Sequence, residues 1–127
     1  MSLQQAKEIV TAIKNKQFHP VYFLMGEEAY YIDAISDYIE NSILSEEEKG
    51  FNQMVLYGRD VSIDDIISQA KRYPMMADRQ VVIVKEAQDL TRTIENLAAY
   101  VENPQSTTIL VLCYTYKKLY PSKRLAK

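Results

Sequence analysis

The spacing of apolar residues along the chain predicts helices and strands in alternation. Apolar residues recur every three or four positions over residues 3–15, which predicts an amphipathic first helix. Residues 21–25 form an unbroken apolar run that ends at Gly26, as expected of a strand buried on both faces of a parallel sheet. Helical spacing then returns from Glu28 to about Leu44. A strand, a glycine turn and a helix in this order are typical of the opening of an α/β unit.

The remainder of the chain repeats this alternation. Ser45 is predicted to cap a short, solvated helical turn. Ser62 is predicted to cap a further amphipathic helix that stops at Pro74. A further helix is predicted over residues 87–101, beginning as late as Thr91 or Thr93, with inward-facing residues Leu90, Ile94, Leu97, Ala98 and Val101. Strands are predicted near residues 21–25, 52–57, 81–85 and 107–113, with Phe51 opening the second and Gln80 the third.

This order of elements predicts a single three-layer α/β domain over residues 1–127, with a mostly parallel sheet flanked by helices. The composition agrees, because 47% hydrophobic and 25% charged residues are typical of an ordered globular chain. The single cysteine, Cys113, cannot form an internal disulfide and indicates a reducing compartment. The N-terminus lacks the apolar core of a secretory signal, and no apolar run reaches membrane length, so we expect a cytoplasmic protein with no membrane partner.

The net charge of −2 argues against a domain dominated by nucleic-acid contacts. The C-terminal end is a local exception, since it carries cations without an acid among them: Lys117, Lys118, Lys123, Arg124 and Lys127. A solvated tail is the simpler interpretation, and a patch that faces DNA or another phosphate is the alternative. The chain also stops where another helix and strand would be expected, so we expect it to be part of a longer protein.

The stretch from Tyr73 to Leu90 combines an apolar turn with the most apolar strand. Pro74 disfavours helix at Tyr73, so the adjacent residues Met75 and Met76 should lie on a short turn directly before the strand. A pair of methionines is more often buried than exposed in a folded protein. The residues by themselves therefore leave open whether this pair belongs to the core or to a contact surface.

The first strand and its glycine raise the hypothesis of a phosphate-binding loop, which the residues do not support. Such a loop needs a second glycine, a lysine and a hydroxyl residue where this chain has Tyr31, Ile32 and Asp33, counted from Gly26. An acidic pair that holds Mg²⁺ should end the third strand, and Lys85-Glu86 stands there instead. We therefore expect a degenerate nucleotide site, no cofactor and no metal.

Two other residues that could act as a metal ligand or a catalytic group, His19 and Cys113, have no suitable partners in the sequence. His19 is the single histidine and has no neighbour at metal-ligand spacing, so a loop histidine is the simpler interpretation. Cys113 has no histidine or acid placed to activate it and is predicted to be a packing residue. A phosphate-accepting receiver domain would need an aspartate at the end of the first or third strand, where Met25 and Lys85 stand.

Several of these segments together resemble a known family. The resemblance rests on residues 22–28 leading to Ile32-Asp33, on Phe51-Asn52, on residues 66–70, and on residues 74–84 with their Pro-Met-Met-Ala-Asp-Arg-Gln and four-residue apolar strand. In this order, over roughly residues 5–120, they resemble the N-terminal domain of the delta subunit of bacterial DNA polymerase III.

The resemblance implies an AAA+-like domain that does not bind ATP and has no catalytic activity of its own. In that family the domain binds the ring-shaped sliding clamp, the beta subunit, and helps to open it during DNA replication. The family's contact is an apolar pair that maps onto Met75 and Met76, with Tyr73 and Pro74 beside them. Both positions carry Met where Leu and Phe are frequent. The lid and collar domains, through which the family joins the other clamp-loader subunits, are absent, and DNA would be reached indirectly through the complex.

A nucleotide-dependent enzyme of the same architecture is the alternative function, either an NTPase of the P-loop type or a transferase. It predicts that Mg-ATP stabilises the protein. Tyr31, Ile32 and Lys85 argue against it, since they stand where such an enzyme needs a small residue and charges suited to phosphate and Mg²⁺.

Overall fold

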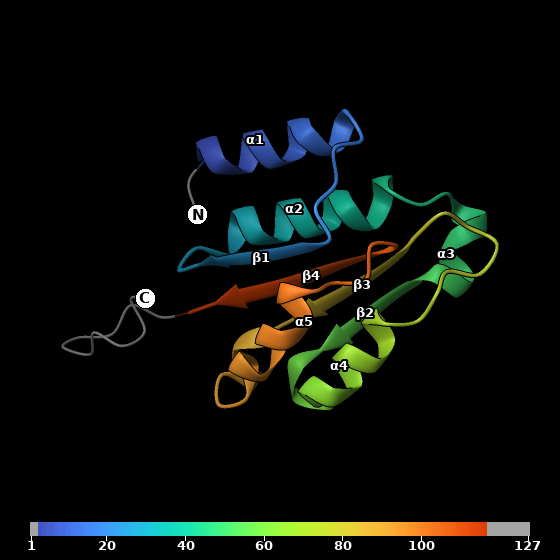
Figure 1. Cartoon of the computed structure of the whole chain (residues 1–127). Coiled ribbons are helices and arrows are strands. Elements are labelled where there is room, and N and C mark those ends of the chain that lie inside the picture. The colour runs from blue at the N-terminus through green and yellow to red at the C-terminus, as the bar shows by residue number, and fades with distance from the viewer. Residues whose placement is uncertain (1–2, 117–127) are drawn as a thin grey trace.

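The sheet and its helices are seen in a computed structural model that describes residues 3–116 (Figure 1). The elements, in chain order, are α1 (Leu3–Lys14), β1 (Val21–Gly26), α2 (Ala29–Ser42), α3 (Glu46–Asn52), β2 (Gln53–Tyr57), η1 (Gly58–Asp60), α4 (Ile63–Ala70), β3 (Gln80–Lys85), η2 (Ala87–Leu90), η3 (Ile94–Leu97), α5 (Ala98–Glu102) and β4 (Thr108–Thr115). Within the described part of the chain, no helix is long and apolar enough to cross a bilayer.

The four strands lie in the order β1-β4-β3-β2, and every neighbouring pair is parallel. Ile83 of β3 lies in register with Val55 of β2 on one side and with Val111 of β4 on the other. The two central strands, β3 and β4, are almost fully buried, which explains why their sequences read as continuous apolar runs. The predicted parallel sheet is confirmed.

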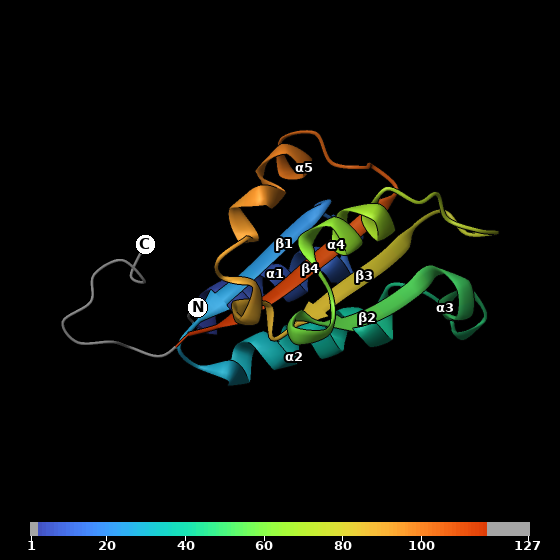
Figure 2. The same ribbon diagram turned by 90° about the horizontal axis from the view of Figure 1, so that it is seen from below.

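Helices cover both faces of this sheet, α1 and α2 on one and α4 with the segment from η2 to α5 on the other (Figure 2). Side chains of the central strands alternate between the two layers. Val81 and Ile83 pack with the α1 and α2 side, whereas Val82 and Val84 pack with the α4 side. The predicted three-layer α/β architecture is therefore confirmed, with one apolar core on each side of the sheet.

Two predicted boundaries were wrong near the turn before β3. Phe51 and Asn52 end α3 instead of opening β2, because a capping box between Ser45 and Glu48 starts the helix and the Asn52 side chain donates to the Glu48 carbonyl at 3.0 Å. Helix α4 ends at Ala70, before the predicted stop at Pro74. The chain therefore begins to turn within three residues of Pro74.

The segment from 87 to 101 was predicted to be one helix, and this was wrong. It consists of two 3₁₀ helices followed by the five-residue α5, with Leu97 and Tyr100 buried and Ala98 and Val101 exposed. The Thr91 hydroxyl donates to the Gln88 carbonyl and lies 2.8 Å from the Tyr114 hydroxyl. The Thr91 side chain competes with the backbone hydrogen bonds that a continuous α-helix needs. The segment therefore forms separate short helical turns, and Thr91 contacts Tyr114 of β4.

Candidate functional site

The segment between α4 and β3, residues 71–79, presents an apolar tip at the end of the sheet where the strands begin; it is called the Met turn below. Met76 is 97% exposed, Tyr73 77% and Met75 52%, while Pro74 is partly buried. The structure thus brings the four predicted contact residues together on one turn. Both methionines lie at the surface, so the question that the sequence left open is answered in favour of exposure.

The beginning of the Met turn is held by the first residue of β3. Gln80 is buried, and its side-chain nitrogen Nε2 lies 2.8 Å from the carbonyl oxygen of Arg72 and 2.9 Å from that of Gln69. The Thr108 hydroxyl of the neighbouring strand donates to the Ala70 carbonyl at 2.6 Å. The bonds to the Arg72 and Ala70 carbonyls satisfy groups that the backbone at the end of α4 leaves open, and the Gln69 carbonyl also accepts from the Arg72 N–H at 3.3 Å. The chain leaves the helix at a fixed place and angle.

The middle of the Met turn is held by the last residue of α3. The Oδ1 atom of Asn52 accepts a hydrogen bond from the Met75 N–H at 2.6 Å, and its Nδ2 donates to the Met75 carbonyl at 2.8 Å. Met76, the next residue, has a φ of 57°, in the left-handed region that residues with a Cβ rarely adopt. A buried amide and an unusual backbone conformation therefore meet at the tip.

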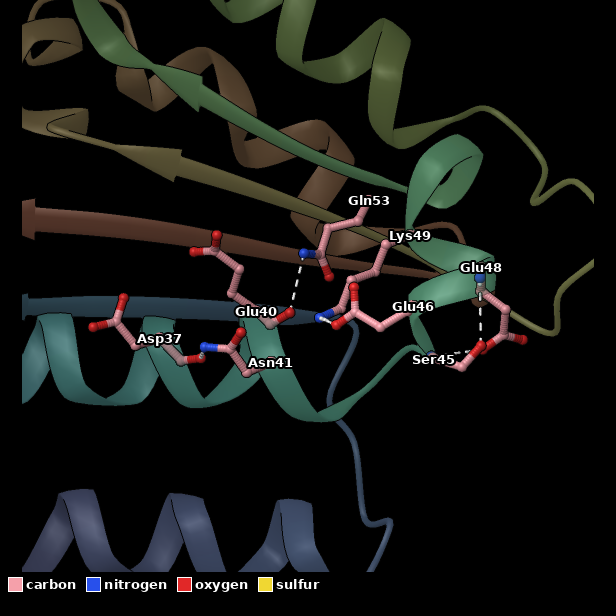
Figure 3. Close-up of polar contacts among 8 residues, drawn as sticks. All are labelled: Asp37, Glu40, Asn41, Ser45, Glu46, Glu48, Lys49 and Gln53. Atoms are coloured by element: carbon pink, nitrogen blue, oxygen red, sulfur yellow. Dashed lines mark hydrogen bonds and ion pairs between the residues drawn. The ribbon is translucent and has the colours of Figure 1, made fainter.

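Helix α3 is itself anchored, as Figure 3 shows. The Ser45 hydroxyl accepts from the Glu48 N–H, the Glu48 carboxylate accepts from the Ser45 N–H, and Lys49 pairs with Glu46 at 3.0 Å. Directly after α3, the Gln53 Nε2 donates to the carbonyl oxygen of Glu40 in α2 at 3.0 Å. The start of the helix that carries Asn52 is thus stabilised locally, and its end is tied to α2.

The end of the Met turn is held by a cation–π contact. The Arg79 guanidinium lies 4.6 Å from the centre of the Phe18 ring, in the loop before β1. A hollow of about 360 Å³ lies beside this contact, and the charged residues of its wall are Lys14, Lys16, Glu48, Asp78 and Arg79. Lys71 and Arg72 also flank the tip on its α4 side. The apolar tip therefore has a mainly cationic rim.

The predicted nucleotide positions Tyr31, Ile32 and Asp33 lie on α2, after Gly26. Ile32 is buried in the core, and Tyr31 and Asp33 lie beside it in the first two turns of the helix. The carboxylate of Glu28 caps α2 by accepting a hydrogen bond from the Tyr30 N–H at 3.3 Å. The positive end of this helix, where a phosphate would sit in a P-loop protein, is therefore occupied by the chain's own negative charge.

The end of β3 is also committed to internal contacts. Lys85 lies 3.8 Å from the Glu40 carboxylate of α2, and Glu86 adopts a left-handed φ of 55°. Gly58 packs so closely against Glu86 that a Cβ on the glycine would lie 2.3 Å from the Glu86 carbonyl oxygen. Among residues 3–116, no group of three or more acids, histidines or cysteines is arranged to hold a metal. Lys85 and Glu86, at this end of the sheet, thus make contacts within the domain.

The remaining chemical candidates show packing roles. Burial raises the pKa of the Cys113 thiol to about 11, although a hydrogen bond with Ser36 acts in the opposite direction. A thiol of this kind is a poor nucleophile at neutral pH. The backbone N–H of His19 donates to the Tyr22 hydroxyl at 3.0 Å, and the two rings meet edge to face. The basic positions Lys117, Lys118, Lys123 and Arg124 lie outside the described residues.

Two residues that shape the Met turn, Asn52 and Gln80, were not predicted to have this role. Asn52 was placed in a strand, although asparagine is depleted in strands, and that mismatch was the available signal. Gln80 opens an otherwise apolar strand, and a buried amide at such a place must find hydrogen-bond partners. Neither signal identifies the hydrogen-bond partner, because Asn52 bonds to Met75 and Gln80 to Arg72 only in the folded chain.

Comparison with known proteins identifies the family. The family model described as DNA polymerase III, delta subunit, matches residues 22–127. The chain is 30% identical to DNA polymerase III subunit delta of Bacillus subtilis (strain 168) over 129 aligned positions, which cover 94% of this chain and 37% of that protein. It thus spans less than two fifths of the length of this relative.

Solved structures agree with the sequence comparison. The Bacillus subtilis DNA clamp loader delta protein superposes with a TM-score of 0.79 at 29% identity, over 94% of this chain and 38% of that one. A DNA polymerase III, gamma subunit-related protein from Thermotoga maritima superposes with a TM-score of 0.57 at 17% identity, over 96% of this chain and 47% of that one, which is a likeness of fold. On the family match, the sequence identity and the shared fold together, the chain belongs to the DNA polymerase III delta subunit family.

Proposed function

We propose that this chain is a non-catalytic domain of a clamp loader, which binds the sliding clamp through Met75 and Met76 and helps to open it during DNA replication. The observation that carries the proposal is the exposure of two adjacent methionines on a turn whose backbone is held from three sides. A soluble protein gains no stability from such a pair, and exposed apolar side chains gathered at one place are typical of contact surfaces.

The chemistry of the tip fits an apolar pocket on a partner. The methionine side chain is flexible and polarisable, so it adapts to pockets of irregular shape. Complete burial of one methionine contributes about 1.5–3 kcal/mol, and a micromolar complex needs about 8 kcal/mol. Two such anchors, with the adjacent Tyr73 ring, supply a large part of that free energy after the cost of association. The cations Lys71 and Arg72 beside the tip favour a partner with an acidic rim.

The proposal assigns the chain a place in a larger assembly. Membership of the delta subunit family supports association with components of the polymerase III complex, and the relatives are more than twice as long as this chain. We place the contacts with other clamp-loader subunits in the part of those proteins that this chain does not cover. Contact with DNA is then indirect, through the assembled complex.

The test is direct binding of the purified chain to the purified sliding clamp of the same bacterium, measured by surface plasmon resonance. We expect the unaltered chain to bind and the double variant Met75→Ala/Met76→Ala to lose binding, with the melting temperature nearly unchanged because both side chains are exposed. Tyr30→Ala is the matched control, since Tyr30 is 69% exposed on α2 at the opposite end of the sheet. A large fall in melting temperature with binding intact would contradict the proposal.

A further inference from the structure

The side chain of Asn52 is devoted to the Met turn. It is 3% exposed, and its oxygen accepts from the Met75 N–H at 2.6 Å while its nitrogen donates to the Met75 carbonyl at 2.8 Å. The same nitrogen donates to the Glu48 carbonyl at 3.0 Å within α3. Both N–H donors of the amide and its acceptor are therefore used. Two of the three bonds reach a residue that is 23 positions away in the chain.

These two bonds fix the peptide groups on both sides of the Met75 Cα, so they fix the direction in which the chain enters Met76. Met76 then adopts its left-handed φ of 57° with its side chain almost fully in solvent. A residue with a Cβ takes this conformation when its surroundings impose it. The side chain of Met76 does not impose it, because it is almost fully exposed. The restraint reaches Met76 through the backbone, and Met75, which Asn52 holds, is the residue directly before it.

We infer that Asn52 is a positioning residue of the clamp contact, which holds the Met turn in the conformation that the clamp binds. This inference rests on the function proposed above. Without the amide, the turn samples other conformations, and the measured dissociation constant rises in inverse proportion to the fraction that keeps the competent one. Asn52 does not touch the partner in this scheme. It acts through the backbone of Met75.

The anchoring of α3 makes the restraint effective. The capping box of Ser45 and Glu48 stabilises the first turn of the helix, and the bond from Gln53 to the Glu40 carbonyl ties its end to α2 (Figure 3). Asn52 directly precedes this tie, so its amide connects an exposed turn to the three-layer core. A side chain on a loose loop would not have this effect, because it would move with the turn.

The experiment uses the whole chain and two variants, Asn52→Ala and the isosteric Asn52→Asp. Clamp binding is measured by surface plasmon resonance at neutral pH, and amide hydrogen exchange is measured residue by residue by NMR. We expect both variants to bind the clamp about tenfold more weakly, corresponding to a turn that is competent about one tenth of the time. In Asn52→Ala the Met75 amide, which donates to Asn52, should exchange much faster, while the amides of β3 and β4 keep their protection. Asn52→Asp keeps an acceptor for the Met75 N–H and removes only the donors to the Met75 and Glu48 carbonyls.

Asn41→Ala is the matched control. The exposed Asn41 side chain donates to the Asp37 carbonyl within α2, and we expect its loss to change neither clamp affinity nor the exchange of Met75. If the alanine variant does not fold, the aspartate variant tests the donor bonds alone through clamp affinity, because it keeps the shape of the side chain and the acceptor of the Met75 N–H but removes the donors.

The outcomes separate the two proposals. Unchanged clamp affinity in Asn52→Ala with a faster-exchanging Met75 amide, or in a folded Asn52→Asp, overturns the inference and leaves the clamp contact standing. Loss of protection throughout β3 and β4 also overturns it, because Asn52 then stabilises the whole domain. A chain that does not bind the clamp, or that binds equally well as Met75→Ala/Met76→Ala, overturns the proposed function and the inference with it.

Discussion

The side-chain nitrogen of Gln80 lies 2.8 Å from the carbonyl oxygen of Arg72, so the first residue of β3 holds the chain at the point where it leaves α4. The same nitrogen lies 2.9 Å from the Thr108 hydroxyl of β4. One buried amide thus joins a helix end and two strands at the base of the Met turn. The turn projects from a fixed platform, although its own apolar side chains contribute little to the core.

This platform predicts a large loss of stability when Gln80 is replaced by leucine. The leucine keeps a similar volume but removes the donor to the partly buried Arg72 carbonyl and one of the donors to the Gln69 carbonyl, which also accepts from the Arg72 N–H at 3.3 Å. We expect the free energy of unfolding, measured by urea denaturation, to fall by about 1–3 kcal/mol, the cost of one carbonyl left without a donor. Gln4→Leu, at an exposed position of α1, is the control and should change it by less than about 0.5 kcal/mol. Equal stability of the two variants would show that the platform is unimportant.

The two glycines of the described chain that lie outside β1 should respond in opposite directions to alanine. A Cβ at Gly58 would lie 2.3 Å from the Glu86 carbonyl oxygen, and backbone must move to admit it, so we expect Gly58→Ala to cost about 1–3 kcal/mol. A Cβ at Gly50 would meet nothing within 4 Å, and Gly50 lies within α3. Gly50→Ala should therefore stabilise the protein by about 0.5–1 kcal/mol. Urea denaturation of both variants measures the contrast, which would be refuted if the two changes had the same sign.

The sequence predicted the elements that depend on local pattern. Strands β3 and β4 are buried on both faces, so their continuous apolar runs identified them, and the periodicity of α1 and α2 placed both helices within two residues of their bounds. The segment from 87 to 101 has apolar residues at helical spacing, yet Thr91 turns the chain by bonding to Gln88 and Tyr114. Spacing cannot reveal such a contact.

The candidate site depended on distant contacts even more. The exposure of Met75 and Met76 could not be derived from the residues, because the same pair fits a core, and the family resemblance decided the prediction. Asn52 bonds to a residue 23 positions away and Gln80 to one 28 positions away. Nothing in the local sequence specifies these partners. They exist because the parallel sheet places α3, α4 and β4 at one end of the domain.

The occupied end of α2 leads to a prediction about nucleotides. Glu28 caps the helix with a carboxylate that would repel a triphosphate, and the buried Ile32 stands where a phosphate loop has its lysine. We expect millimolar Mg-ATP to leave the melting temperature unchanged in a thermal shift assay, because a ligand stabilises a protein only by binding its folded state. Mg²⁺ without nucleotide is the control. A rise of several degrees specific to Mg-ATP would revive the nucleotide-dependent enzyme as an explanation.

The buried thiol predicts a loss of stability at high pH. Burial raises the pKa of Cys113 from 9.0 in the reference state to about 11 in the folded protein. Between these values the unfolded thiol has lost its proton and the folded one keeps it, so its contribution to stability is complete below pH 9 and is lost as the pH rises toward 11. The expected loss is on the order of 2 kcal/mol.

The measurement for Cys113 is a difference between two proteins. Urea denaturation of the unaltered chain and of Cys113→Ala from pH 8 to pH 11 isolates the thiol, because the ten tyrosines and the lysines titrate in both. The stability of the unaltered chain should fall more steeply with pH than that of the variant. Parallel curves would mean that the thiol ionises with the same pKa in the folded and unfolded states.

The left-handed backbone of Met76 predicts that replacing this residue by glycine stabilises the domain but weakens clamp binding. Its φ of 57° costs a residue with a Cβ on the order of 1–2 kcal/mol, and glycine adopts it without that cost. Glycine also loses more entropy on folding, so we expect Met76→Gly to raise the free energy of unfolding by a net amount of about 0.5–1 kcal/mol. The side chain itself is 97% exposed and contributes almost nothing to the core.

The same variant should bind the clamp at least tenfold more weakly, because it removes one of the two apolar anchors. Met76→Ala is the matched control, since it removes the same anchor but retains the Cβ and with it the unfavourable φ. It should lose affinity to a similar degree without the gain in stability. Urea denaturation and surface plasmon resonance on both variants measure the two effects separately. A glycine variant less stable than the alanine variant would contradict the left-handed conformation, and one that binds like the unaltered chain would contradict the contact. A glycine variant that is more stable and binds more weakly would mean that the strained backbone at this exposed tip is retained for the partner.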